Sequence, residues 1–310
     1  MRQIWIALSL LALSLTSSAP ARAQNKIEVV ASFTILADLV RNVAGDRAQI
    51  TTLIGPGGDA HVYTPSPADA KRIAAAKLVI VNGLGFEGWL PRLVKSSGSK
   101  ATVIEASRGI KPLEAADSDH DHKDHNHGKA HTHDAQFDPH AWQSVANVKV
   151  YVGNIRDALA AADPDGAALY AANAADYLGK LDALDSEIRA AIAKIPAQRR
   201  KVISTHDAFG YFANAYGITF IAPQGVSTDA EASARAVARI IKQIKAEAIP
   251  AVFIETITDP RLMRRIAAET GAKIGDALYS DSLTDENGEA PTYIAMVRHN
   301  IKALTSALGD

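Results

Sequence analysis

Short apolar runs rich in β-branched residues alternate with stretches of helical periodicity along most of the chain. Apolar side chains that recur at steps of three and four indicate an amphipathic helix, whereas short apolar runs between turn residues indicate buried strands. In the first half of the chain this pattern predicts strands at 27–33, 49–53, 78–82 and 102–105 and helices at 35–43, 67–76 and 88–95. Such an alternation is typical of a parallel sheet covered by helices.

The second half repeats the alternation. It predicts strands at 201–204, 219–221, 251–255 and 273–274 and helices at 208–216, 233–247, 260–270 and 291–308. We therefore expect an α/β protein with two Rossmann-like lobes of parallel sheet flanked by helices, one at 24–162 and one at 196–310. The length of 310 residues is sufficient for two cores of ordinary size.

One long, rigid helix is predicted to join the lobes, at 163–195. Asp163 suits its N-cap and Pro164 its first helical position. At the usual rise per residue the helix would be roughly 50 Å long, and such a rod would oppose wide opening of the lobes. The alternative is a break into two helices near Gly179, because an interior glycine costs about 1 kcal/mol of helix stability. The apolar residues that recur at helical spacing are Tyr177, Leu181, Leu184, Ile188, Ile192 and Ile195.

Residues 1–23 have the three parts of a secretory signal peptide. Arg2 supplies positive charge, an apolar run covers 4–15, and the small residues at 21–23 resemble a cleavage site. The apolar run is too short to anchor the chain in a bilayer, so we expect cleavage after Ala23 and a soluble, exported protein. Cleavage would remove two arginines and no acid, which changes the formal charge from -1 to -3. This near-balance gives no reason to expect nucleic acid as a partner.

The chain contains no cysteine. We therefore expect no disulfide, no thiolate zinc site, no cysteine catalysis and no lipid-bearing cysteine at the signal cleavage site. Any metal site must use nitrogen and oxygen ligands.

Six of the ten histidines lie in a polar segment at 117–134, together with aspartate, lysine and glycine. A segment of this composition cannot form a hydrophobic core. Neutral imidazole is the commonest protein ligand for borderline metals, and histidine-rich tracts are typical of metal binding. The segment predicts a loop that binds metal weakly through His120, His122, His125, His127, His131 and His133.

Three of the remaining histidines stand in turn-like segments, namely His61, His140 and His206. Two of these segments follow a predicted strand, and open α/β sheets bind ligands at the carboxyl ends of their strands. We therefore expect the three imidazoles to meet in the cleft between the lobes. His299 lies inside the last predicted helix, where a solvent-facing or hydrogen-bonded role is expected.

A carboxylate should complete the site, because three neutral imidazoles leave the charge of a divalent cation unbalanced. The candidates are Asp229, Glu255, Asp276 and Asp281. The residues themselves do not distinguish Glu255 from Asp281, and each candidate has the alternative role of a helix cap or a surface acid.

Four segments resemble the ligand segments of one family, the cluster A-I metal-binding proteins that serve ABC importers. They are GDAHVYTPSP at 58–67, FDPHAW at 137–142, HDAFGYF at 206–212 and DALYSDSL at 276–283. The histidine-rich insertion resembles a feature of the zinc branch of this family, the ZnuA-like and AztC-like receptors. The resemblance covers essentially the whole chain from Lys26 to Leu308, and it implies that Asp281 is the fourth ligand.

The resemblance implies a periplasmic receptor, not an enzyme, that captures Zn²⁺ in the interlobe cleft and delivers it to an ABC permease and its ATPase. Zinc is expected over manganese, because manganese receptors of the family tend to carry a carboxylate where His206 stands. Three nitrogens and one oxygen also suit tetrahedral zinc. The histidine-rich loop is expected to assist capture and to offer a docking point for a periplasmic zinc metallochaperone.

We further expect a monomer that releases zinc by local motion around His140 or of the second lobe. Acid should weaken binding near pH ~6.5, where free imidazole becomes protonated. Two alternatives from other classes stay open. A zinc hydrolase would keep an open coordination position and use Glu255 as its general base. A periplasmic zinc buffer would use the histidine-rich loop alone and never contact a permease.

Overall fold

Two four-stranded parallel sheets form the framework of the computed structural model, which describes residues 26–115 and 137–309. The strand order is β2-β1-β3-β4 in the first lobe and β6-β5-β7-β8 in the second. In each sheet the first strand of the lobe pairs with the second strand on one side and with the third on the other. The strand order therefore reverses at the first strand, and α/β sheets bind ligands at such switch points. The predicted α/β architecture of two helix-flanked parallel sheets is confirmed.

All eight predicted strands are present, with ends that differ from the prediction by at most three residues. The strands are β1 (Ile27–Phe33), β2 (Ala48–Ile54), β3 (Leu78–Val81), β4 (Thr102–Glu105), β5 (Lys201–Ile203), β6 (Thr219–Ile221), β7 (Ala251–Val252) and β8 (Lys273–Ile274). The α-helices of the described ranges are α1 (Thr34–Ala44), α2 (Pro67–Ala75), α3 (Leu90–Ser97), α4 (Val145–Ala162), α5 (Ala167–Ala193), α6 (Gly210–Tyr216), α7 (Ala234–Glu247), α8 (Arg261–Thr270) and α9 (Tyr293–Leu308).

The long helix α5 is continuous over 27 residues and does not break at Gly179. It begins at Ala167, after a short 3-10 helix at Pro164–Gly166, and thus later than the sequence predicted. The reason lies in the side chain of Asp163, which does not cap the helix. Its carboxylate instead accepts two hydrogen bonds of 2.8 Å from the guanidinium of Arg47.

Helix α4 is an element that the sequence analysis did not predict. Its buried side chains nevertheless recur at helical spacing, and they are Val145, Val148, Tyr151, Val152, Ile155, Ala158 and Leu159. The helix directly follows the 137–142 segment and packs against α5 and α1. Because α4 connects the His140 region to α5, it fixes the position of one half of the candidate site.

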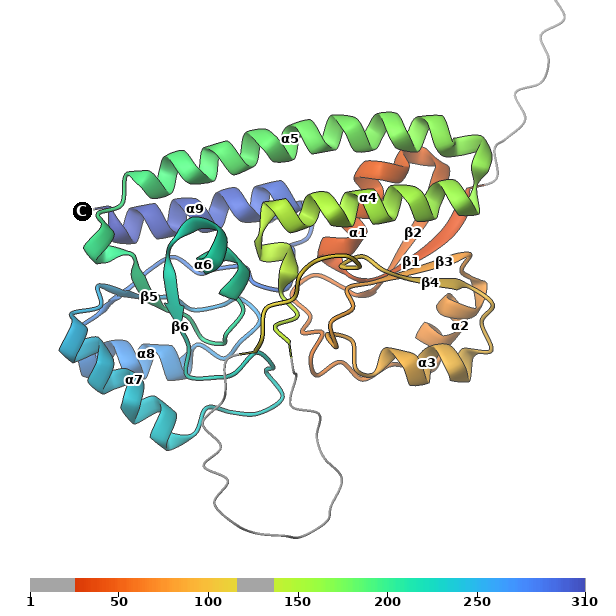
Figure 1. Ribbon diagram of the computed structural model, residues 1–310. Helices are drawn as coiled ribbons and strands as arrows, with labels where there is room; N and C mark the ends of the chain where they lie inside the picture. The colour runs from red at the N-terminus through yellow and green to blue at the C-terminus, as the bar shows by residue number, and fades with distance from the viewer. Residues whose placement is uncertain (1–25, 116–136, 310) are drawn as a thin grey trace, which may run out of the picture.

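The helix α5 runs along the whole molecule above both lobes, with α4 and α9 beside it (Figure 1). One large hydrophobic core includes the first sheet, α1, α4, α5 and α9, and it extends to α6 in the second lobe. A smaller core lies between the second sheet and helices α7 and α8. The shared core joins the first lobe to the inner part of the second, and close-packed interiors resist large rotations.

Two predicted segments lie outside the described residues: the signal peptide at 1–23 and all six histidines of the 117–134 segment. Next to the second of these, Glu114 and Phe137 form an isolated antiparallel bridge. None of the helices within 26–115 and 137–309 combines the length and hydropathy that a membrane crossing requires.

Candidate metal centre

The side chains of His61, His140, His206 and Asp281 meet at one point, although they come from distant parts of the sequence. Each offers one ligand atom, and these atoms lie within 4.8 Å of one another. His140 Nε2 lies 3.3 Å from His61 Nε2 and 3.4 Å from His206 Nε2. Asp281 Oδ2 lies 3.4 Å from His61 Nε2 and 3.3 Å from His206 Nε2. The structure thus brings together the three predicted histidines and one of the two carboxylates that the residues alone did not distinguish.

His61 is carried by the loop that connects β2 to α2. The loop ends at a capping box, in which Ser66 Oγ accepts from the backbone N–H of Asp69 (3.3 Å) and Asp69 Oδ2 accepts from the backbone N–H of Ser66 (2.7 Å). On its other side, the indole N–H of Trp89 donates to the carbonyl oxygen of Ala60 (3.0 Å). A defined helix start and an anchored carbonyl therefore place His61 at the carboxyl end of the first sheet.

His140 is held by the aspartate two residues before it. Asp138 Oδ1 accepts from the backbone N–H of His140 (2.9 Å) and lies 2.8 Å from His140 Nδ1. A carboxylate at Nδ1 places the proton there and directs the Nε2 lone pair toward the cluster. The Trp142 ring packs on the imidazole with a centroid distance of 5.2 Å. The sequence analysis included Asp138 in the motif around His140 but did not predict its contact with the Nδ1 atom of the ring.

His206 follows β5 and has a carboxylate behind it as well. Glu255 Oε2 lies 2.6 Å from His206 Nδ1, and Glu255 Oε1 accepts from the backbone N–H groups of Thr205 (2.8 Å) and His206 (2.9 Å). Glu255 thus contacts the side of the imidazole ring that faces away from the Nε2 cluster. Its parallel bridge with Leu278 continues the pairing of β7 and β8 and brings the chain toward Asp281.

The segment around Asp281 is tied to both other parts of the site. The indole N–H of Trp142 donates to the carbonyl oxygen of Ser280 (2.9 Å), next to the His140 segment. The hydroxyl of Ser282 accepts from the backbone N–H of Gly57 (2.8 Å), in the His61 loop. These two bonds fix the carboxylate between the lobes.

The electrostatics of the cluster favour a cation. Asp281 is 1% exposed, and within the described ranges its carboxylate oxygens have no hydrogen-bond donor other than the histidine rings. Burial by itself raises the pKa of Asp281, but the charges of His140 and His206 outweigh it and hold this pKa well below its usual range. A buried, ionised carboxylate is costly unless positive charge compensates it.

The three histidines differ in their proton affinity. Burial by itself lowers the pKa of His140, but the carboxylates of Asp281 and Asp138 together have the larger effect and raise this pKa to about 9. The pKa of His206 is raised well above its usual value, because Glu255 and Asp281 outweigh burial. Burial lowers the pKa of His61, with Asp281 opposing the change. Protons therefore compete with a cation from about pH 9 downward, a higher range than the sequence predicted.

Aromatic rings of the first lobe pack against the histidine cluster. The Phe86 ring meets the His61 ring edge-on, with centroids 4.8 Å apart, and also packs on Trp142 at 4.9 Å. The His61 side chain is the only one of the three imidazoles with any exposure, 5%, whereas those of His140 and His206 are fully buried. Water therefore reaches the site from the His61 side.

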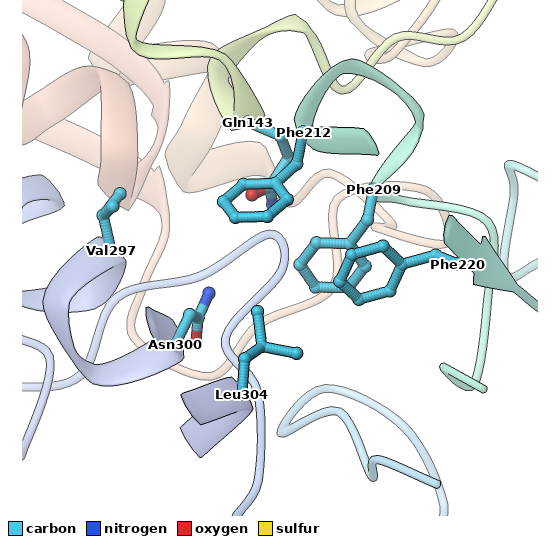
Figure 2. Close-up of a pocket in the computed structure, with 7 residues that line it drawn as sticks. All are labelled: Gln143, Phe209, Phe212, Phe220, Val297, Asn300 and Leu304. Atoms are coloured by element: carbon cyan, nitrogen blue, oxygen red, sulfur yellow. The ribbon is translucent and has the colours of Figure 1, made fainter. Parts of the chain in front are cut away.

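A separate small cavity lies between α6, β6 and α9 (Figure 2). Its walls are mostly aromatic and aliphatic, and they consist of Gln143, Phe209, Phe212, Phe220, Val297, Asn300 and Leu304. The amide of Gln143 donates to the carbonyl oxygen of Ser280 (2.8 Å), so the cavity lies close to the Asp281 segment. It contains no ionisable side chain among these lining residues, and it does not contribute to the histidine cluster.

The chain is similar over nearly its full length to characterised metal-binding proteins. The family described as zinc-uptake complex component A, periplasmic (ZnuA), matches residues 29–307. The manganese-binding lipoprotein MntA of Halalkalibacterium halodurans is 35% identical, over 92% of this chain and 89% of its own length. The iron-binding protein YfeA of Yersinia pestis is 31% identical, over 96% and 91%.

Solved structures agree with this relationship. The periplasmic zinc binding protein TroA from Treponema pallidum superposes with a TM-score of 0.82 at 30% identity, over 92% of this chain and all of that one (100%). The Mn-bound periplasmic metal binding protein from candidatus Liberibacter asiaticus gives a TM-score of 0.80 at 28% identity, with the same coverage. The relatives are named after different metals, namely manganese, iron and zinc. This chain belongs to the ZnuA-like family of periplasmic metal-binding receptors that serve ABC transporters.

Proposed function

We propose that the chain is a zinc receptor, in which His61, His140, His206 and Asp281 hold Zn²⁺ for delivery to an ABC permease and its ATPase. The observation that carries this proposal is the spacing of the ligand atoms. Two nitrogens bound to zinc at about 2.0–2.1 Å and at a tetrahedral angle lie about 3.3–3.4 Å apart. The Nε2 atom of His140 lies 3.3 Å from that of His61 and 3.4 Å from that of His206. Asp281 Oδ2 lies 3.3 Å from His206 Nε2 and 3.4 Å from His61 Nε2, which agrees with this spacing, and Asp281 Oδ1 lies 3.7 Å from His140 Nε2.

Manganese is the second candidate, because the relative MntA is named for it. Manganese favours more oxygen ligands and a larger coordination shell than zinc. The cluster offers a single carboxylate, and the nearby Glu255 is turned toward His206 Nδ1 rather than toward the ligand atoms. The donor set therefore supports zinc.

Four protein ligands leave no open coordination position for an activated water, and this argues against the hydrolase alternative. Its general base would be Glu255. Both oxygens of that carboxylate are already engaged, one with the His206 ring and one with two backbone N–H groups. Glu255 therefore suits a role in positioning His206.

Metal titration of the purified chain tests the proposal. One zinc ion per chain should bind tightly, apart from weaker binding by the 117–134 segment, and one equivalent of Co²⁺ in its place should give the intense visible absorption of a tetrahedral centre. The matched variant is His206→Glu, which adds an oxygen ligand and should shift the preference from zinc toward manganese. A weak, six-coordinate cobalt spectrum for the wild-type chain would contradict the zinc assignment.

The proposal extends to the 117–134 segment, which lies outside the described residues. We propose that its six histidines bind zinc weakly, raise its concentration near the cleft and offer a docking point for a periplasmic metallochaperone. Deletion of this segment should slow zinc capture while the affinity of the tight site stays nearly unchanged. We also propose that the receptor acts as a monomer, which sedimentation of the zinc-loaded chain would test.

A further inference from the structure

The stretch of the first lobe that contains α2 and α3 carries exposed charge of a single sign. Between Val62 and Ile104 the only acids are Asp69 and Glu87, and both are buried. Every exposed charged side chain in this stretch is basic. Four of them lie on the two helices and define the α2–α3 basic face, namely Lys71, Arg72, Arg92 and Lys95, while Lys77 and Lys100 follow the helices in the chain. The whole chain has a formal charge of only -1, so positive charge is concentrated here.

These cations are largely uncompensated. Within the described ranges only Arg72 of this face forms an ion pair, with Asp69 at 2.9 Å. Elsewhere on the surface, cations pair with acids on their own helix, as Lys180 does with Asp176 (2.8 Å) on α5 and Arg265 with Glu269 (2.8 Å) on α8. A surface with unopposed charge of one sign attracts partners of the opposite sign and steers their approach.

The α2–α3 basic face adjoins the loop that carries His61. Helices α2 and α3 pack together on the side of the molecule away from α5 (Figure 1). The hydroxyl of Tyr63, two residues after His61, donates to Asp69 in α2 (2.8 Å). The rings of Tyr63 and Trp89 meet with centroids 5.0 Å apart, at the start of α3. A partner bound to this face would therefore lie beside the metal-bearing loop.

We propose that the α2–α3 basic face is the surface through which the first lobe docks on an acidic surface of the permease. This inference rests on the proposed function, because it needs a permease that receives the metal. An anionic membrane is the less suitable partner. Helices that bind membranes insert an apolar face, but α2 and α3 carry none of the large hydrophobic side chains that are exposed on this chain.

The test is a triple charge reversal in the full chain, Lys71→Glu, Arg92→Glu and Lys95→Glu. Its matched control is Lys180→Glu, Lys194→Glu and Lys302→Glu, which changes the net charge equally on exposed positions of α5, its end and α9. Each variant is expressed in a strain that lacks its own receptor gene but retains the permease and ATPase. The first variant should lower the rate of zinc uptake by about tenfold or more, with weaker salt dependence, and the control should leave it unchanged. Both purified variants should bind zinc within about twofold of the wild type.

Two results would overturn the docking inference. One is equal uptake with both variants. The other is a wild-type chain that sediments with phosphatidylglycerol vesicles at physiological salt when the α2–α3 variant does not, which would identify lipid as the partner. A failure of the proposed function would look different, because the wild-type chain itself would then support no zinc uptake in this strain.

Discussion

Asp138 and Asp59 each lie two residues before a histidine of the metal centre, but their side chains make different contacts. Asp138 and Asp59 each accept a hydrogen bond of 2.9 Å from the backbone N–H of the histidine that follows, His140 or His61. Asp138 also reaches the Nδ1 atom of the His140 ring, at 2.8 Å. Asp59 turns its other oxygen away and accepts from the hydroxyl of Thr228 in the second lobe, at 2.5 Å.

The difference divides the three histidines into a fixed half, His140 and His206, and a movable half, His61. His140 and His206 are fully buried, and each has a carboxylate at its Nδ1 atom, on the side of the ring away from the cluster. His61 has no such carboxylate among the described residues, and its loop is tied to the second lobe through Asp59 and the Gly57 bond to Ser282. We therefore expect His61 to leave the metal first during release. The sequence had instead suggested motion around His140 or of the second lobe. The burial of His140 makes the first of these motions costly, and motion of the second lobe stays a prediction.

The largest expected effect comes from removing rings of the fixed half. His140→Ala or His206→Ala removes a ligand and leaves a buried carboxylate without its partner, so zinc affinity should fall well over ~100-fold. His61→Ala leaves no such orphaned group and should cost less. Competition titration against a chromophoric chelator measures all three variants. If His61→Ala were the most damaging of them, the division into two halves would be wrong.

Acid should act mainly on the fixed half. The pKa of His140 is raised to about 9 and that of His206 is raised as well, so in the metal-free protein near neutral pH both rings carry a second proton and are positively charged. Binding should then release about two protons, and affinity should fall roughly 100-fold per pH unit as the pH drops below this range. Calorimetry in buffers of different ionisation enthalpy counts the protons. Release of no protons near neutral pH would contradict the assignment.

Substitution of the carboxylates behind the rings sharpens the comparison directly. Asp138→Asn and Glu255→Gln keep the size of the side chain but remove its charge, and each should lower zinc affinity by about 10–100-fold. Asp59→Asn is the matched control, because the Asp59 side chain bonds to the His61 backbone and to Thr228 but not to the His61 ring. Equal losses of affinity in the three variants would remove the distinction between the two aspartates.

The smallest effect is expected at the tie between the lobes. Thr228→Val removes the hydroxyl that donates to Asp59, at a cost of about 1 kcal/mol, so zinc should dissociate roughly fivefold faster. Ser227→Ala is the control, because Ser227 Oγ bonds only to the backbone N–H of Asp229 within the described part of the chain. Stopped-flow mixing of the zinc-loaded protein with excess chelator gives the rates. An unchanged rate for Thr228→Val would show that this bond does not restrain the His61 loop.

Local patterns in the sequence located most of the fold. The strand predicted at 27–33 coincides with β1, because its burial follows directly from its apolar residues. The strand predicted at 251–255 ends at Val252, because its partner β8 is only two residues long and the length of a partner strand is not a local property. Helix α4 was not predicted, although its buried side chains recur at helical spacing.

The site shows the same limit. Histidines in turns after strands could be identified from the sequence, and the structure brings the three side chains together. The sequence could not separate Asp138 from Asp59, because both occur two residues before a histidine and differ only in tertiary contacts. Nor could it choose between Glu255 and Asp281, whose directions depend on the bridge between Glu255 and Leu278.

X-ray absorption at the zinc edge tests the central claim most directly, because it reports the number, type and distance of the atoms around the metal. For the zinc-loaded chain we predict a four-coordinate centre with three imidazole nitrogens at about 2.0–2.1 Å and one carboxylate oxygen at about 2.0–2.2 Å. A shell of five or six ligands, or one with fewer than three imidazoles, would contradict a site that both lobes close around a single zinc ion.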